Sequence, residues 1–323
     1  MNHLRGLLGT LPFLAGCQGA QSALDPAGAE AEAVRTLFLG MAGAGGVIWL
    51  GVTALVWFAL RPGRRVVPEQ SASRLIFWGG AVVPSAALIV LLTYAFWLMP
   101  SLRPFATAAD DALRIEVVGR QFWWQVTYHR AGVPVIAANE LRLPVGERVE
   151  VSLKSDDVIH SFWIPALGGK MDMIPGRENR LSLLANKAGV FRGACAEFCG
   201  SSHALMAMTA VVLEPADFEN WLAIEAQPSI GVNQKGGDLF IRHGCGACHR
   251  VAGTATSGRL GPDLSHLGSR QMLAAGIMTN TEDNLVRFIV APHAFKPGLG
   301  MPAFSMLPAE DIRAIAVWLG GLK

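Results

Sequence analysis

Residues 195–206, CAEFCGSSHALM, place four potential metal ligands within one short stretch. Cys199 is four positions after Cys195, His203 is four positions after Cys199, and Met206 is three positions after His203. Thiolate, imidazole and thioether groups are soft or borderline ligands for transition metals. The spacing therefore predicts a metal site, and the rest of the chain must indicate which metal it binds.

A cysteine pair of this spacing has simpler explanations, namely a disulfide, a structural zinc site or a redox switch. A disulfide would leave His203 and Met206 without a role, and zinc rarely uses methionine. A mononuclear blue copper site needs one cysteine, two histidines and an axial methionine. The stretch SDDVIHSFWIP (155–165) supplies a second histidine, His160, at the end of a strand-like run. Two thiolates, two imidazoles and one thioether are too many for one copper and suit two coppers bridged by both sulfurs.

The second cysteine pair lies in GCGACH (244–249), which contains the C-x-x-C-H pattern. In an exported protein this pattern is typical of covalent haem c, with thioethers from Cys245 and Cys248 and an axial ligand from His249. A thiol-redox pair followed by a chance histidine is the alternative. The helix-like lead-in and the later stretches LGPDL (260–264) and GMPAF (300–304) favour haem.

Methionine opposite histidine is the axial pair that raises the potential of cytochromes c. Met301, about fifty residues after the haem motif, is the predicted second ligand. Met306 and Met278 are the alternatives, and both suit a hydrophobic core better.

Low charge and two long apolar runs indicate that part of the chain lies in lipid. Only 16% of the 323 residues are charged, against about 25% in an ordinary soluble domain. Residues 36–60 and 75–99 contain no charged residue, and each exceeds the roughly 20 residues that a membrane helix needs. Pro84 is expected to kink the second helix, which membrane helices tolerate. Two buried helices of a soluble protein are the alternative.

The intervening loop, 61–74, sets the orientation of the two helices. It carries four arginines, Arg61, Arg64, Arg65 and Arg74. The positive-inside rule places such a loop in the cytoplasm. Everything from about residue 101 onward is then extracytoplasmic.

The N-terminus has the layout of a signal peptide over residues 1–16, with a basic start and a short apolar run. LAGC (14–17) resembles a bacterial lipobox, which predicts cleavage before Cys17 and lipidation of that cysteine. An ordinary signal with an incidental cysteine is the alternative. Residues 17–35 form the expected extracytoplasmic N-terminal segment.

After the two apolar runs, the residue composition of the chain changes twice. Between residues 113 and 215, short runs of β-branched and aromatic residues alternate with Gly, Pro and Asn, which predicts a β-sandwich or Greek-key barrel within 101–226. Residues 227–233 form a polar linker. Residues 234–323 consist of short helical runs separated by Gly and Pro loops.

The copper motifs together resemble the pattern of cytochrome c oxidase subunit II with its binuclear copper A centre. The matching stretches are SDDVIHSFWIP, KMDMIPGRENR, CAEFCGSSHALM and GRQFWWQVTY, and the resemblance extends from about residue 22 to 222. Residues 234–323 resemble a class I cytochrome c. The implied fold is a two-helix transmembrane hairpin, a cupredoxin-like β-barrel and then an all-α cytochrome c domain.

The resemblance also implies roles for individual residues. By this resemblance, the copper ligands are His160, Cys195, Cys199, His203, Met206 and the backbone carbonyl of Glu197. The Glu197 side chain is implied as a magnesium ligand at the border with subunit I, with a surface carboxylate as the alternative. The family spacing favours Met206 over Met208. In the cytochrome part, Pro262 is implied to orient His249, and Phe240 and Trp318 to lie where the terminal helices cross.

Two positions depart from the family pattern. Phe122, followed by Trp123, stands where the family usually has the tryptophan at which electrons enter. We hypothesise that a tethered haem relaxes the need for that tryptophan, with neutral variation as the alternative. Phe77 stands where a glutamate for proton uptake is often found, so no residue is assigned to proton entry.

The implied function is electron entry into a respiratory haem-copper oxidase. Electrons would pass from a donor cytochrome or membrane complex to one covalent haem c, then to two coppers, and then to haem in subunit I, where oxygen is reduced to water. The expected partners are subunits I and III, the donor and membrane lipid, with no nucleic acid. The expected location is the bacterial inner membrane with periplasmic metal domains. The alternative is the electron-entry subunit of a copper A-containing nitric oxide reductase.

Overall fold

The computed structural model describes residues 17–62, 67–102, 113–130, 134–229 and 234–323. It divides into two units, one formed by Val34–Arg103 and the other by the residues on either side of that range. The predicted signal peptide, 1–16, lies outside the described residues, as do parts of the predicted cytoplasmic loop and linker.

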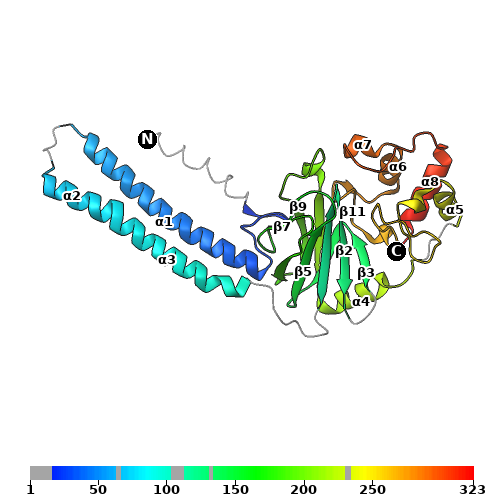
Figure 1. The fold of residues 1–323 in the computed structure, drawn as a ribbon, viewed down its shortest axis with the longest axis horizontal. Helices are drawn as coiled ribbons and strands as arrows, with labels where there is room; N and C mark the ends of the chain where they lie inside the picture. Colours follow the sequence, from blue (N-terminus) through cyan, green and yellow to red (C-terminus); the bar gives the residue numbers. More distant parts are fainter. Residues whose placement is uncertain (1–16, 63–66, 103–112, 131–133, 230–233) are drawn as a thin grey trace, which may run out of the picture. The chain divides into compact units, whose positions relative to one another are not determined.

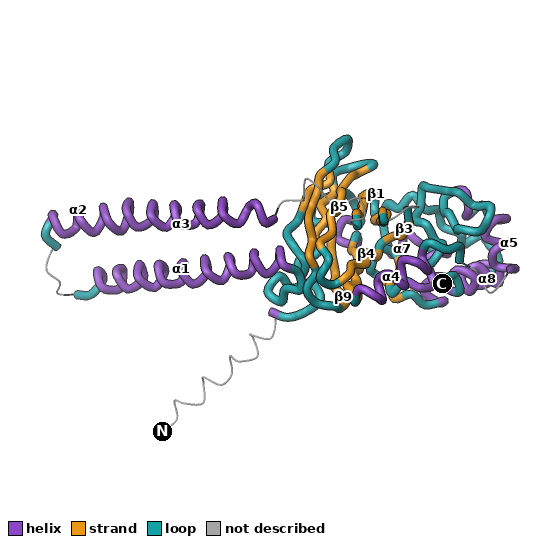
Figure 2. The backbone as a smooth tube through the Cα atoms, turned by 90° about the horizontal axis from the view of Figure 1, so that it is seen from below, coloured by secondary structure: helices purple, strands orange, loops and turns teal. Residues whose placement is uncertain are grey.

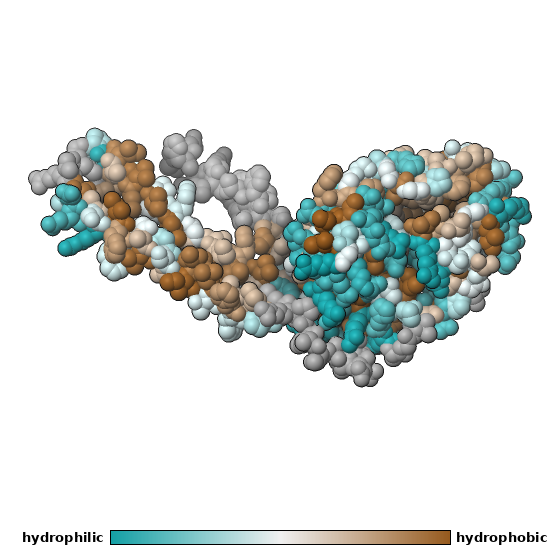
Figure 3. All heavy atoms as spheres, in the orientation of Figure 1, coloured by the Kyte–Doolittle hydropathy of each residue, from teal (hydrophilic) through white to brown (hydrophobic). Residues whose placement is uncertain are grey.

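The first unit consists of two helices that are long and apolar enough to cross a membrane (Figure 2). Its elements are α1 (Ala29–Leu60), α2 (Glu69–Phe77), the π-helical turn η3 (Trp78–Val82), α3 (Val83–Leu98) and the 3₁₀ turn η4 (Met99–Leu102). Their apolar side chains are exposed in the isolated chain, as the brown surface in Figure 3 shows. Such extended apolar surface is stable only against lipid or other protein.

Helix α1 begins at Ala29, earlier than the predicted run of 36–60, because hydropathy marks the apolar part of a helix and not its first turn. Pro84, which is predicted to kink the second helix, is the second residue of α3, and the π-helical turn η3 directly precedes that helix. Proline cannot donate to the carbonyl four residues earlier, and a widened turn is one of the ways in which a helix accommodates this.

The sheet domain, residues 113–225, contains two five-stranded sheets (Figure 1). The first has the order β3-β2-β1-β5-β8, with β1 (Arg114–Arg120), β2 (Trp123–His129), β3 (Val135–Ala138), β5 (Arg148–Ser155) and β8 (Asn179–Leu184). The second has the order β4-β10-β9-β6-β7, with β4 (Glu140–Pro144), β6 (His160–Trp163), β7 (Met171–Met173), β9 (Gly189–Cys195) and β10 (Ala207–Leu213). The 3₁₀ turn η5 (His203–Leu205) and helix α4 (Pro215–Glu225) complete it.

Alternation along the strands creates the core between the two sheets. In β5, every second residue is buried, including Val149, Val151 and Leu153. Neighbouring strands are antiparallel except β1 with β5 and β4 with β10, which are parallel. The predicted β-sandwich is confirmed as two sheets packed around one core.

The first turn of α1 is tied to the sheet domain. Glu30, only 5% exposed, accepts hydrogen bonds from Arg148 Nη1 and from the backbone N–H of Leu184, the latter at 3.0 Å. Gly28 bridges to Ala185, and its Cα lies so close to the Leu167 backbone that no side chain fits. This contact sets where the chain leaves the sheet domain.

The C-terminal domain, residues 234–323, is built from short helices and turns. Its elements are α5 (Gln234–Arg242), η6 (Cys245–Ala247), η7 (Leu267–Ser269), β11 (Met272–Leu273), β12 (Met278–Thr279), α6 (Glu282–Val290), α7 (Pro292–Phe295) and α8 (Ala309–Gly320). Helices α5 and α8 cross where Gly236 leaves no room for a side chain against Ala314 and Trp318. The Phe240 and Trp318 rings pack there, with centroids 5.2 Å apart.

Removing the Glu30 carboxylate should destabilise the sheet domain, because Arg148 Nη1 and the Leu184 N–H would each lose a buried acceptor. We expect Glu30→Ala to lower the free energy of unfolding by about 3 kcal/mol, measured by chemical denaturation of the full chain in detergent. Glu214→Ala, at an exposed position, is the control and should change it by less than about 0.5 kcal/mol. Equal effects of the two substitutions would show that the buried pair contributes no more than a surface carboxylate.

Candidate metal centre

Three neighbouring strands bring the predicted metal ligands to one end of the second sheet. His160 is the first residue of β6, and Cys195 is the last residue of β9. Strand β9 pairs with β6 on one side and with β10 on the other. Met206 directly precedes β10, so the loop that carries Cys199 and His203 begins and ends beside the His160 ring.

The two cysteine sulfurs lie at the middle of the group, 3.8 Å apart. Each has an imidazole nitrogen beside it and one weaker donor. The distances are 3.7 Å from Cys195 Sγ to His160 Nδ1, 3.2 Å from Cys195 Sγ to the Glu197 carbonyl, 3.6 Å from Cys199 Sγ to His203 Nδ1, and 3.9 Å from Cys199 Sγ to Met206 Sδ.

This donor set fits two copper ions. The sulfurs are not joined as a disulfide, and their separation is within reach of one metal bonded to both, since a metal–thiolate bond is roughly 2.3 Å long. Because donors surround both sulfurs, one ion cannot use them all. His160, Cys195, Cys199 and Met206 are buried, so the site excludes water as a competing ligand.

The two thiols differ sharply in acidity without a metal. The hydrogen bond between the sulfurs lowers the pKa of Cys195 to about 3. The same bond and burial raise the pKa of Cys199. One proton is therefore shared by the pair, since two adjacent buried thiolates would repel each other. A cation that binds both sulfurs must displace this proton.

Asp157 orients the first histidine and was not singled out from the sequence. Its Oδ1 lies 2.8 Å from His160 Nε2, which leaves Nδ1 directed at Cys195. Gly119 packs against the same ring, where an added Cβ would lie 2.9 Å from His160 Cδ2. A carboxylate on the second nitrogen is the usual support of a metal-bound histidine. The available signal was a carboxylate three residues before His160.

The aromatic run at 121–124 is attached to this loop. Gln121 Nε2 donates to the Cys199 carbonyl at 2.6 Å, and Trp124 Nε1 donates to the Ala207 carbonyl at 3.1 Å. Phe122 and Trp123, the predicted entry positions, are 2% and 8% exposed. Neither ring is therefore freely exposed in the described structure.

The predicted haem motif forms the turn η6, after Gly244 in the left-handed region at φ +77°. Cys245 and Cys248 are half-buried and not disulfide-bonded. His249 Nδ1 lies 2.8 Å from the Pro262 carbonyl, and burial lowers the pKa of His249. The ring is thus neutral with Nε2 available, as an axial ligand requires. These three residues fit covalent haem c.

The candidate methionines differ in their surroundings. Met301 is half-buried and packs against the core of the C-terminal domain. Met306 is 75% exposed, and Met278 is a buried residue of β12. Of the three, Met301 has a side chain that packs against the core and is still partly exposed.

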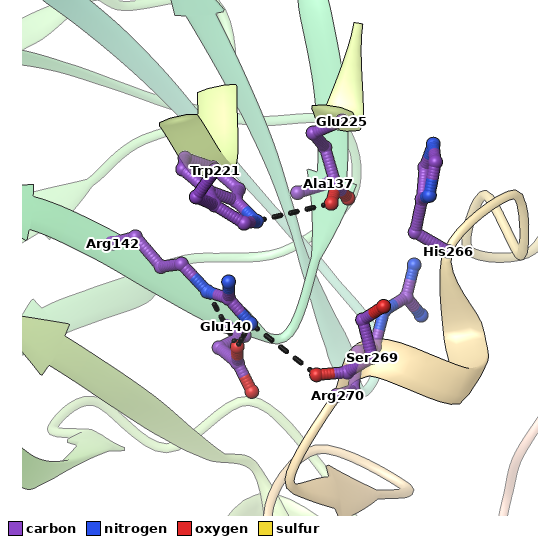
Figure 4. A pocket seen from close by; sticks show the side chains of 8 residues that line it. All are labelled: Ala137, Glu140, Arg142, Trp221, Glu225, His266, Ser269 and Arg270. Carbon is purple, nitrogen blue, oxygen red and sulfur yellow. Dashed lines mark hydrogen bonds and ion pairs between the residues drawn. The ribbon is translucent and has the colours of Figure 1, made fainter. Parts of the chain in front are cut away.

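Three further predicted side chains differ in exposure. Glu197 is half-buried, Cys17 is exposed, and Phe77 is exposed at the end of α2. A small pocket between the sheet domain and the C-terminal domain contains none of the predicted site residues (Figure 4). Its charged lining includes Arg142 hydrogen-bonded to Glu140 and, at 3.3 Å, to the Ser269 carbonyl.

Loss of the Asp157 carboxylate should weaken metal binding, because His160 would lose the partner that fixes its orientation. We expect Asp157→Asn to reduce copper affinity by roughly 10-fold to 100-fold, measured by competition with a chelator. Asp156→Asn is the matched control, because Asp156 is 51% exposed and pairs with Arg120 instead. Equal copper affinity in the two variants would contradict a supporting role for Asp157.

Comparison with known proteins gives two family matches in the observed order. Residues 133–213 match the periplasmic domain of cytochrome c oxidase subunit II, and residues 233–323 match cytochrome c. Among solved structures, the periplasmic domain of subunit II of cytochrome oxidase of Bradyrhizobium japonicum is 33% identical, with a TM-score of 0.32, and covers 37% of this chain and 95% of its own.

Curated relatives cover nearly the whole chain. Cytochrome c oxidase subunit 2 of Alkalihalophilus pseudofirmus is 34% identical over 96% of this chain and 94% of its own length. The subunit 2 of Bacillus subtilis is 30% identical over 81% of this chain and 79% of its own. The chain therefore belongs to the cytochrome c oxidase subunit 2 family, as a subunit of a haem-copper oxidoreductase with a C-terminal cytochrome c domain.

Proposed function

We propose that this chain is the electron-entry subunit of a respiratory oxidase, in which electrons pass from covalent haem c to binuclear copper A and on to haem in subunit I for reduction of oxygen to water. Family membership already implies copper A, haem and a complex with subunit I. The observation that carries the finer proposal is the convergence of donors on two buried sulfurs 3.8 Å apart.

In this proposal, six residues hold two coppers: His160, Cys195, Cys199, His203, Met206 and Glu197 through its carbonyl. The two thiolates would serve both ions, and the two imidazoles would complete the donor set. Burial of the sulfurs and the fixed His160 ring keep the donor positions constant. A rigid donor set favours rapid one-electron transfer, because little must move when the charge changes.

Four further residues hold the haem. Cys245 and Cys248 form the two thioethers, and His249 supplies the axial nitrogen. The Pro262 carbonyl keeps the proton of His249 on Nδ1. Met301 is the proposed second axial ligand, supported by its place in the core of the C-terminal domain.

The sequence pattern supports a membrane arrangement for this chain, as do the length and apolar composition of α1 and of the helical segment Glu69–Leu98. We propose spans at 36–60 and 75–99, joined by a cytoplasmic loop at 61–74. The metal domains, 101–226 and 234–323, then lie outside the bacterial inner membrane, joined by the linker 227–233.

The remaining proposals concern the surface and the assembly. Residues 1–16 are a signal peptide, and the exposed Cys17 is the lipid-bearing N-terminus of the mature chain. The Glu197 carboxylate binds magnesium at the border with subunit I. Subunit III, membrane lipid and a donor cytochrome or membrane complex are the other partners. Phe122 and Trp123 line the route by which electrons enter.

The proposal predicts the cofactor content of the purified oxidase. We expect two coppers in this chain for each covalent haem c, and an electron paramagnetic resonance signal from one electron shared by two coppers. Both are measured on the assembled complex, with subunit I metals subtracted. A single copper in this chain would contradict the two-copper centre. Reduction of nitric oxide in place of oxygen by the complex would favour the nitric oxide reductase alternative.

The axial assignment predicts a change in haem potential. We expect Met301→Ala to lower the potential by on the order of 0.1 V, within the roughly 0.8 V that axial ligands control, because a methionine ligand raises it. Met306→Ala, at an exposed position, is the control. Spectroelectrochemical titration of the haem c band measures both. A lower potential in the Met306 variant alone would reassign the ligand.

A further inference from the structure

A four-residue segment of the C-terminal domain lies directly against the predicted electron-entry surface. This docking segment, Lys296–Leu299, ends two residues before Met301. Lys296 is 1% exposed, although lysine is rarely buried without a charged partner. Its Nζ donates to the Phe122 carbonyl of the sheet domain at 2.6 Å and to the Ala274 carbonyl of its own domain at 3.1 Å. Lys296 therefore bridges the two domains.

The next residues of the docking segment contact the copper loop. The Pro297 carbonyl accepts hydrogen bonds from both Ser201 Oγ, at 2.8 Å, and Ser202 Oγ, at 2.7 Å. Ser202 is fully buried and directly precedes His203. Two hydroxyls on one carbonyl fix the position of the segment in two directions.

Gly298 and Leu299 complete the contact. Gly298 has φ +79°, and an added Cβ would collide with Ser201 and lie 3.6 Å from Phe122 Cε2. Only glycine adopts this conformation without strain and leaves room for such a close approach. Leu299 packs against the hydrophobic core of the sheet domain. The segment thus covers Phe122, which explains its low exposure.

Elsewhere the junction has hydrogen bonds from the sheet domain to backbone carbonyls of the C-terminal domain, and the Gln271 N–H donates in the opposite direction to Glu140 Oε2 at 3.1 Å. Arg120 Nη1 donates to the Arg259 carbonyl at 2.9 Å, Arg192 Nη1 to the Gly276 carbonyl at 2.9 Å, and the Ala207 N–H to the Ala275 carbonyl at 3.1 Å. Within the described ranges, no ion pair joins the two domains. Positions of backbone carbonyls depend on a folded partner, so these contacts fit one docked arrangement and not loose electrostatic attraction.

We propose that Lys296 is a positioning residue that anchors the C-terminal domain on the surface formed by Gln121, Phe122, Ser201 and Ser202. This inference rests on the proposed function and assigns its entry surface to the chain's own cytochrome domain. The docked arrangement would hold the haem-bearing domain on the face at which electrons are proposed to enter the copper centre.

The chemistry of Lys296 explains its role as an anchor. Undocking separates its ammonium from the Phe122 carbonyl and exposes both groups to water. Docking restores a short hydrogen bond, 2.6 Å from Lys296 Nζ to the Phe122 carbonyl, in a site from which water is excluded. A methionine of similar length would fill the same space and donate nothing to Phe122.

The test compares Lys296→Met with Lys235→Met in the assembled, fully loaded oxidase. Lys235 is an exposed lysine of α5 and serves as the matched control. Two measurements are made: the rate of haem-to-copper electron transfer after flash reduction, and hydrogen–deuterium exchange of peptides that contain residues 121–124 and 199–203. The exchange measurement reports docking whether or not electrons move, because local opening exposes buried amides.

For Lys296→Met, we expect electron transfer to slow about tenfold, the factor that one lost hydrogen bond produces. Exchange at 121–124 and 199–203 should rise, with haem and copper contents unchanged. Lys235→Met should change neither. If Lys296→Met kept the wild-type rate of electron transfer and the wild-type rate of hydrogen–deuterium exchange, the proposal would be overturned.

Two further outcomes remain decisive. If Lys296→Met fails to bind haem, the double variant Ser201→Ala and Ser202→Ala removes both donors to Pro297 from the sheet domain. Faster exchange at 121–124 in that copper-loaded variant supports the docked arrangement, and unchanged exchange overturns it. If the wild-type oxidase shows no haem-to-copper transfer, the proposed function fails, and the exchange data still decide whether Lys296 anchors the domain.

Discussion

The arrangement of this protein depends on the pairing of strand β9 with β6 and β10. That pairing places Cys195 beside His160 and returns the chain to the same end of the sheet at Met206. Hydrogen bonds from the strands therefore hold the ends of the loop, and the sulfurs meet at 3.8 Å without a disulfide. His160 and Cys195 lie at strand ends and Met206 directly precedes β10, so sheet geometry sets where these three donors meet.

The same loop has a second function as an attachment surface. Cys195 and Cys199 belong to the group of candidate metal ligands, whereas Ser201 and Ser202 donate hydrogen bonds to the Pro297 carbonyl. Gln121 connects the two by donating to the Cys199 carbonyl. The candidate metal ligands and the contact with the C-terminal domain thus share one short piece of backbone. A flexible linker raises the effective concentration of a tethered domain, whereas these contacts select a single orientation for it.

Much of the architecture follows from local patterns in the chain. Uncharged runs indicated the two long helices, and strand-length alternation indicated the β-domain. The details that local patterns missed have clear causes. Helix α1 begins at Ala29 because its first turn binds the sheet domain through Glu30, a long-range contact. The helix near Pro84 contains a π-helical turn because a helix can absorb a missing N–H without a sharp bend. The burial of Phe122 depends on a domain that begins more than a hundred residues later.

The sequence by itself determined the chemical identity of both candidate cofactor sites, because ligands four, four and three residues apart, or in a C-x-x-C-H motif, are encoded in local spacing. It also identified His160 as a missing partner, since the donor set was incomplete without it. Only the tertiary structure decided how the two domains meet. Lys296 and Phe122 are 174 residues apart in the chain, and no local pattern distinguishes a buried lysine that donates to a distant carbonyl from an exposed one. Such a contact exists only after both domains have folded.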